Sequence, residues 1–187
     1  MTYTPYQKQM EEQAYVLDFL PYGKSDDPRR QPVVQALGEN FFTLLELYPK
    51  SGINFELGEK IYVGKGERDK IISIRGRVNY EELTSNGKNS LNDIIKKIIY
   101  SREPEFISFF NRCGSINIRQ HQLELIPGIG KKIMTVILEE REKKPFESFE
   151  DLEKRIHMNK IDELVAQRIE EELKGSKYYI FVRPSRY

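Results

Sequence analysis

The apolar residues follow two different patterns along the chain, and the pattern changes near Tyr80. Before that point they form short runs that Pro and Gly interrupt, which is typical of β-strands. These runs predict strands over Gln13–Leu20, Val33–Leu37, Asn40–Tyr48, Lys60–Val63 and Lys70–Val78. A sheet this short has exposed edges unless it closes, so we expect a small closed barrel of the OB-like kind.

From about Tyr80 onward the apolar residues recur at spacings of three and four, which predicts helices with one apolar face. Ser90 or Asn92 can cap the first helix, and Pro104 can open the second, which ends near Gly114. The remaining helices are predicted over Ile118–Leu125, over Lys131–Arg141, from Pro145 through Ile156, and from Ile161 to Leu173.

The change of pattern divides this α+β protein into two domains. Residues 1–82 are expected to form the OB-like β-barrel, and residues 83–175 an all-α domain. The chain becomes β-like again within residues 176–187, in the segment Lys177–Val182, which is too short to stand alone. We therefore expect this C-terminal strand to return to the barrel.

Composition narrows the class of protein. The apolar runs, such as Phe41–Leu45, are far shorter than a membrane span of roughly 20 residues, and Met1–Pro5 lacks the features of a secretory signal, so a cytoplasmic protein is predicted. Cys113, His121 and His157 are too few for a disulfide or a four-ligand zinc site, so neither a metal nor another cofactor is expected. A charged fraction of 32% and the absence of Trp are typical of proteins from hot environments.

The strongest functional signal is the glycine-rich segment Ile126–Lys132. Pro127–Gly130 predicts a tight turn, after which a helix begins whose free N–H groups and positive dipole end favour a phosphate. The glycines let the backbone approach the ligand, the isoleucine fills the turn, and the lysines add charge. Contacts of this kind read no bases. The residues assigned to the site are Gly128, Ile129, Gly130, Lys131 and Lys132.

The segment Leu123–Lys132, with Ile137 and Arg141 downstream, resembles the helix-hairpin-helix motif of many DNA- and RNA-handling proteins. Met134 departs from the motif, which often has a small residue at that position. Residues 144–152 look like the connector of tandem helix-hairpin-helix domains, and the second copy then has His157–Lys160 in place of the glycine turn. The resemblance implies that this second hairpin keeps a structural role and has lost the phosphate.

Over nearly the whole chain, a small barrel followed by this helical domain resembles an uncharacterised archaeal family described as predicted RNA-binding proteins. The resemblance implies RNA as the ligand, and structured RNA linked to the ribosome or the translation machinery as its source. It names no catalytic residue.

Basic residues on the barrel form a second candidate surface. Since the net charge is only +1, binding to nucleic acid has to depend on local patches. Strand alternation in Lys70–Val78 places Arg75 and Arg77 on the outer face, and Lys65 lies in the preceding loop. These side chains could follow a phosphate backbone, while a solvated strand face is an equal alternative.

Enzymatic functions find less support. Cys113 has no histidine at a spacing that would pair the two as nucleophile and base, and acidic clusters such as Glu139–Glu142 alternate with basic residues, as solvated helix faces do. We therefore expect a non-enzymatic nucleic-acid-binding protein, with RNA favoured over DNA. A DNA-binding accessory protein in repair or recombination and a protein-interaction scaffold remain the alternatives.

Overall fold

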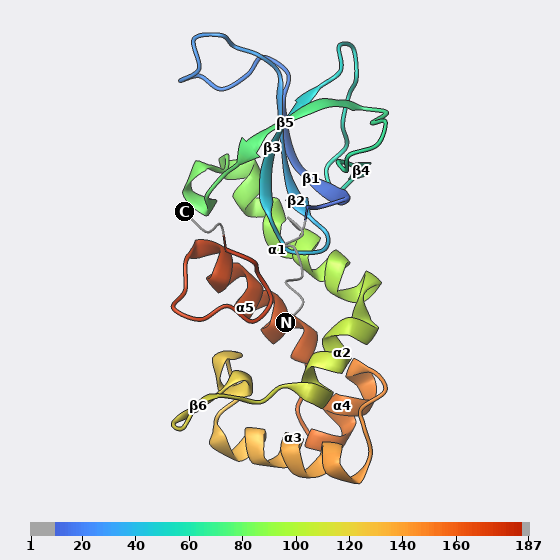
Figure 1. Ribbon diagram of the computed structural model, residues 1–187, viewed down its shortest axis with the longest axis vertical. Coiled ribbons are helices and arrows are strands. Elements are labelled where there is room, and N and C mark those ends of the chain that lie inside the picture. The colour runs from blue at the N-terminus through green and yellow to red at the C-terminus, as the bar shows by residue number, and fades with distance from the viewer. Residues whose placement is uncertain (1–9, 185–187) are drawn as a thin grey trace, which may run out of the picture. The chain divides into compact units, whose positions relative to one another are not determined.

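The first part of the chain forms one antiparallel sheet (Figure 1). The computed structural model describes residues 10–184. Within them, a five-stranded sheet pairs its strands in the order β4-β1-β2-β3-β5. The bounds are β1 Gln13–Leu20, β2 Val33–Gly38, β3 Leu44–Pro49, β4 Lys60–Tyr62 and β5 Ile71–Arg77. The predicted strands are confirmed, with ends that shift by at most a few residues.

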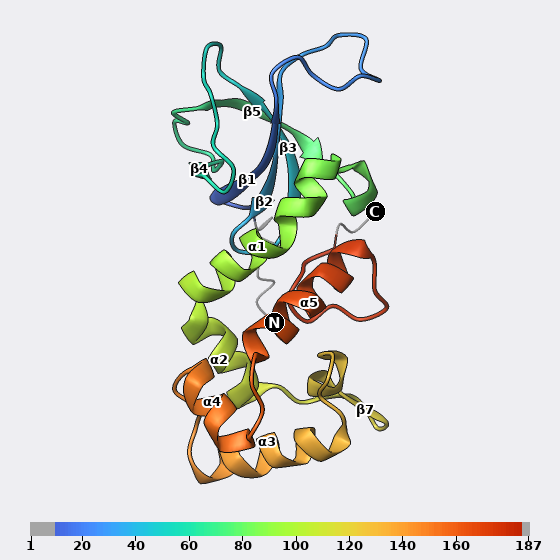
Figure 2. The ribbon, with the colours of Figure 1, turned by 180° about the vertical axis from the view of Figure 1, so that it is seen from behind.

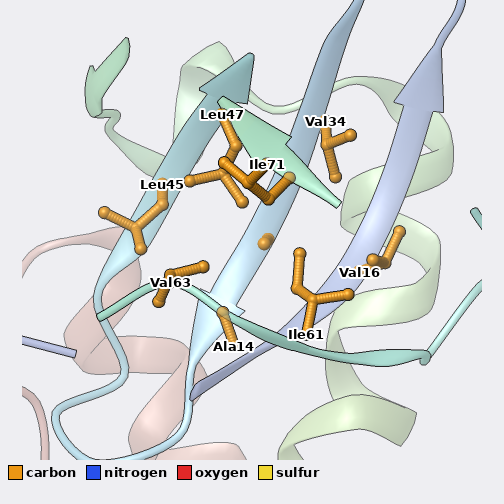
Figure 3. Close-up of a cluster of buried hydrophobic side chains, with 9 residues drawn as sticks. Ala14, Val16, Val34, Leu45, Leu47, Ile61, Val63 and Ile71 are labelled. Carbon is orange, nitrogen blue, oxygen red and sulfur yellow. The ribbon is translucent and has the colours of Figure 1, made fainter. Parts of the chain in front are cut away.

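Alternation along the strands builds the core of this sheet. Ala14 and Val16 of β1 lie two residues apart and point to the same side, where they meet Leu45 and Leu47 of β3 in one apolar cluster (Figure 3). The full cluster comprises Ala14, Val16, Val34, Ala36, Leu45, Leu47, Ile61, Val63 and Ile71. Every residue of β2 is buried, as expected for the central strand of the order.

The sheet is curled but open. Its edge strands are β4, which pairs with β1, and β5, which pairs with β3. No pairing between β4 and β5 closes the ladder in the part of the chain that the structure describes. The expected closed barrel is therefore replaced by a half-barrel, because β4 has only three residues and pairs on one side.

The later part of the chain is mainly helical, and the described residues divide between Ser90 and Leu91 into two compact units. Arg183 groups with the first unit. The helices are η1 Tyr80–Glu82, α1 Ser85–Ser101, α2 Glu103–Arg112, η2 Gln122–Leu125, α3 Lys131–Lys143, α4 Phe149–Ile156 and α5 Ile161–Lys174. None of the helices found within residues 10–184 combines the length and the apolarity needed to cross a membrane.

Two helices begin at other residues than predicted. Helix α1 starts several residues before Ser90, because the Gly87 N–H donates to the Thr84 hydroxyl at 2.9 Å and gives the helix an earlier cap. Helix α4 starts after Pro145, because the Ser148 hydroxyl accepts from the Asp151 N–H at 3.1 Å. Local capping groups thus decide both starts.

The helix predicted over Ile118–Leu125 is wrong. Strands β6 (Ser115–Asn117) and β7 (Gln120–His121) form a hairpin, and the short 3₁₀ helix η2 follows it (Figures 1 and 2). The Asn117 side chain accepts from the Arg119 N–H at 2.9 Å, which stabilises a turn at the point where the helix was expected. The second unit is therefore not all-α.

The expected C-terminal strand does not form among the described residues, although the chain does return to the sheet unit at Arg183, whose N–H donates to the Phe41 carbonyl at 3.2 Å. The N–H groups of Ile180, Phe181 and Val182 donate to the buried Glu172 carboxylate of α5 at 2.8–3.0 Å. These bonds hold the segment within the helical unit, and no strand forms up to residue 184. The rest of the predicted tail, residues 185–187, lies outside the described residues.

Candidate nucleic-acid interface

The glycine-rich turn predicted from the sequence joins η2 to α3. We call residues 126–132 the first hairpin. The Ile129 N–H donates to the Ile126 carbonyl at 3.1 Å, and both side chains are buried, so the turn is closed and filled. Gly128 has φ +81°, in the left-handed region that favours glycine. A Cβ there would lie 3.3 Å from the end of the Met158 side chain and 3.4 Å from that of Leu164, so the turn packs closely against both.

The N-terminus of α3 is open. Gly130 is its N-cap in an extended conformation, and a Cβ at Gly130 would meet nothing within 4 Å. No side chain among the described residues caps this end, and the first turn contains no acidic residue. The backbone N–H groups of the first turn lack partners within the helix, and the dipole makes this end positive. The local chemistry therefore favours an anion such as phosphate.

Two lysines add charge at the same place. Lys131 and Lys132 are the first two residues of α3, and both are exposed. Neither ammonium pairs with any residue between 10 and 184. The structure thus brings together all five residues that the sequence assigned to this site.

The turn between α4 and α5, residues 156–161, is built differently, and we call it the second hairpin. It contains no glycine, and His157 and Lys160 adopt φ values of 54° and 63°. The Ile161 N–H donates to the Glu153 carboxylate at 2.8 Å, and the first turn of α5 contains Asp162 and Glu163. In the second hairpin, the Glu153 carboxylate thus binds a backbone amide at the start of the helix, whereas no side chain does so in the first hairpin among the described residues.

The two hairpins lie side by side. The nearest neighbours of Gly128 are Met158 of the second hairpin and Leu164 of α5. Apolar side chains of the second hairpin and of α5 thus form the surface on which the turn at Gly128 packs. The second hairpin therefore stabilises the turn of the first hairpin through packing contacts.

A buried histidine supports the start of the first hairpin. His121 is 8% exposed, and its Nδ1 accepts from the Leu123 N–H at 3.1 Å. The His121 N–H in turn donates to Glu124 at 2.8 Å. Burial and the nearby Arg141 charge lower the pKa of His121, and Glu124 opposes this shift. The sequence had placed His121 in a helix, so this role was missed.

Arg141 joins the end of α2 to α3. Its guanidinium donates to the carbonyl oxygens of Phe110 at 3.2 Å and Cys113 at 2.8 Å. Burial raises the pKa of the Cys113 thiol, while Arg141 opposes the shift. The thiol is thus held in its neutral form, which is the less reactive one.

The basic residues of the sheet are arranged less favourably. Arg75 is paired internally, with Asp27 at 3.1 Å and with the buried Glu46 at 3.4 Å. Arg77 is exposed and lines the same polar recess of about 680 Å³ as Arg75. Lys65 is exposed in the loop before β5 and is not part of this recess. The structure therefore groups two of the three predicted residues, and only Arg77 of these two lacks an acidic partner among the described residues.

No group of three or more His, Cys, Asp or Glu side chains is placed to hold a metal ion within residues 10–184.

The chain is similar to known archaeal proteins over most of its length. Residues 10–183 match a family model described as "Protein of unknown function (DUF655)". The uncharacterised protein MJ0038 of Methanocaldococcus jannaschii is 48% identical over 179 residues, which cover 94% of this chain and 82% of that protein. The crystal structure of Af1531 from Archaeoglobus fulgidus, also of the DUF655 family, is 45% identical with a TM-score of 0.86, and the match covers 92% of this chain and 100% of that chain. The resemblance to an uncharacterised archaeal family is thereby confirmed, and the chain belongs to the DUF655 family of proteins of unknown function.

Proposed function

We propose that this protein binds nucleic acid, with RNA as the favoured ligand, by holding phosphates at the first hairpin. The observation that carries the proposal is the open N-terminus of α3, which has no capping side chain among the described residues and begins with two unpartnered lysines. Backbone N–H groups and lysine ammonium groups contact phosphates rather than base edges. Binding is therefore independent of sequence.

The two hairpins fit a tandem helix-hairpin-helix unit with one working copy. The turn at Gly128 packs against the second hairpin, which supplies apolar contacts and whose Ile161 N–H already donates to Glu153. The role proposed for the protein is to position a ligand, without chemistry. Cys113, the one cysteine of the chain, is buried with a raised pKa and suits no nucleophilic step.

RNA is proposed ahead of DNA because of the resemblance to predicted RNA-binding proteins, and structured RNA of the translation machinery is the first source to examine. The half-barrel, proposed as OB-like, offers two further exposed basic residues, Arg77 at the polar recess and Lys65 in the loop before β5, whose charges point to the same class of ligand.

The test is binding of the full chain to structured RNA, duplex DNA and single-stranded RNA across a salt series. The variant Lys131→Ala/Lys132→Ala should reduce the slope of log affinity against log salt by about 1–2, because each lost phosphate contact releases about one counterion fewer. Lys143→Ala/Lys144→Ala is the charge-matched control, since it removes two exposed lysines, paired with Glu140 and Glu147, from the other end of α3. Its slope should stay at the wild-type value.

Two results would contradict the proposal. Equal losses in both lysine variants would mean that charge alone, and not the first hairpin, attracts the ligand. If wild-type protein binds no nucleic acid at low salt, the protein-interaction scaffold becomes the better hypothesis, because an apolar interface hardly responds to salt.

A further inference from the structure

The tip of the β6–β7 hairpin presents an isoleucine to solvent. Ile118 is 105% exposed, more than any other large apolar residue within residues 10–184, and Arg119 beside it is also exposed. The hairpin projects from the side of the helical unit at which α3 begins (Figures 1 and 2). Exposed apolar residues are ordinary when they occur singly. What distinguishes Ile118 is how it is held and what surrounds it.

The hairpin is anchored at both its base and its tip. At the base, the Gly114 N–H donates to the Gln122 side chain at 2.9 Å, and the Gln122 N–H donates to the Gly114 carbonyl at 3.0 Å. At the tip, the Asn117 side chain accepts from the Arg119 N–H at 2.9 Å. A hydrogen-bonded turn therefore holds the Ile118 side chain in its exposed position.

The chain that forms this hairpin and the first hairpin is mainly basic. Between residues 112 and 138 the chain has one acidic residue, Glu124, and its carboxylate accepts from the His121 N–H. The same stretch carries four cationic residues, Arg112, Arg119, Lys131 and Lys132. The β6–β7 hairpin runs through η2 directly into the first hairpin, so the apolar tip and the phosphate site belong to one basic segment.

We propose that the β6–β7 hairpin is a wedge, which inserts Ile118 between stacked bases of a base-paired nucleic acid while the first hairpin holds its phosphates. Proteins that bind the minor groove of duplex DNA frequently insert an apolar side chain such as isoleucine between base steps, and the proposal extends this device to a duplex held at its phosphates. Arg119 supplies that neighbouring charge. This inference rests on the proposed function and adds its substrate class, a paired duplex with a step that can be opened.

The experiment compares a fully paired RNA duplex with the same duplex carrying one central mismatch and 2-aminopurine beside it. Opening a weakened step costs less than opening a paired one, so wild-type protein should prefer the mismatched duplex by on the order of tenfold. The 2-aminopurine fluorescence should rise on binding. Ile118→Ser should lose both effects and keep the wild-type salt slope, while Ile118→Leu should retain both.

The controls separate the wedge from the phosphate grip. Leu57→Ser removes another apolar side chain, 65% exposed and in the other unit, and should behave as wild type. Lys131→Ala/Lys132→Ala should weaken binding to both duplexes and keep the preference for the mismatch. If that variant weakens binding but Ile118→Ser matches wild type in preference and fluorescence, the wedge is overturned and the proposed function stands. If wild-type protein binds neither duplex but binds single-stranded RNA, the wedge is overturned and the proposed function stands. If it binds no nucleic acid, both are overturned.

Discussion

The two hairpins of the helical unit have the same connectivity but opposite chemistry at the start of the helix that follows. In the first, α3 begins without a capping side chain or an acidic first turn among the described residues, and two lysines stand free. In the second, Glu153 accepts from the Ile161 N–H, and acidic residues fill the first turn of α5. A helix start that is satisfied from within has little to offer a phosphate. The comparison teaches that the occupant of the amides, rather than the turn itself, separates a binding hairpin from a structural one.

The two hairpins also differ in which residues adopt a positive φ in their turns. Gly128 takes its positive φ without strain, whereas His157 and Lys160 take theirs with a Cβ in place. The second hairpin can accept this cost because its internal hydrogen bonds and its contact with Gly128 stabilise it. The first hairpin keeps an open helix end, whose N–H groups are free to donate to water or to a ligand.

The largest effect is expected from making the first hairpin resemble the second. In Gly130→Asp a carboxylate caps α3 at a position with open space and extended backbone. RNA affinity should fall by about 1.5–3 kcal/mol, roughly ten- to a hundredfold, because the carboxylate occupies the amides and repels phosphate. The free energy of unfolding should rise by about 0.5–1 kcal/mol. RNA titration and urea unfolding check the two signs, and unchanged affinity in a stabilised variant would remove the first hairpin as the phosphate site.

The converse change opens the second hairpin. Glu153→Ala removes the acceptor of the Ile161 N–H, and Ile161 is fully buried, so the free energy of unfolding should fall by about 1–3 kcal/mol. RNA affinity should not fall, since no phosphate contact is lost. Glu139→Ala is the control, because this exposed carboxylate has no partner among residues 10–184. A loss of RNA affinity at constant fold would contradict this and show that binding needs the capped second hairpin, whereas a gain would show that its freed amide can also hold a phosphate.

A smaller effect is expected from relieving the backbone of the second hairpin. His157→Gly places glycine at φ 54°, where a Cβ is unfavourable, and should raise the free energy of unfolding by about 0.5–1 kcal/mol. RNA affinity should stay constant. If urea unfolding shows that the variant is less stable, the His157 side chain stabilises the fold by more than its backbone strain costs.

The smallest effect concerns pH. Burial and Arg141 lower the pKa of His121 in the folded state, so below about pH 6.5 the unfolded chain binds more protons and stability declines as the pH falls. The stabilising contribution is complete above that pH. His121→Asn keeps an acceptor for the Leu123 N–H and should lose this part of the decline between about pH 7 and about pH 5. Equal pH profiles for the two proteins would show that His121 does not carry it.

Sequence reasoning predicted the parts of the fold that local pattern controls. The strands, α2, α3 and α5 follow from apolar spacing and end where expected within a few residues. The β6–β7 hairpin was missed because Ile118 and Leu125 suggest a helical face, although Asn117 could have indicated a turn. Closure of the sheet depends on whether two distant edges meet, and no local pattern contains that information.

In the candidate site, too, the local features were predicted from the sequence and the contacts between distant residues were not. Gly128, Gly130 and the two lysines were predicted because a glycine turn and a helix start are local features. The internal cap of the second hairpin was not, since Glu153 reaches Ile161 across eight residues and a turn of unusual conformation. The pairing of Arg75 with Asp27 also joins residues far apart in the chain, so strand alternation alone left Arg75 as a candidate contact.

The most direct test of the contrast is one NMR titration of the full chain with a short RNA duplex, in which the backbone amide signals of both hairpins are followed together. The amides of Gly130, Lys131 and Lys132 should shift and saturate with the bound fraction, because they donate to a phosphate. The amide of Ile161 should stay in place, because it already donates to the Glu153 carboxylate. Equal shifts at both hairpins, or none at the first while RNA binds elsewhere, would contradict the account.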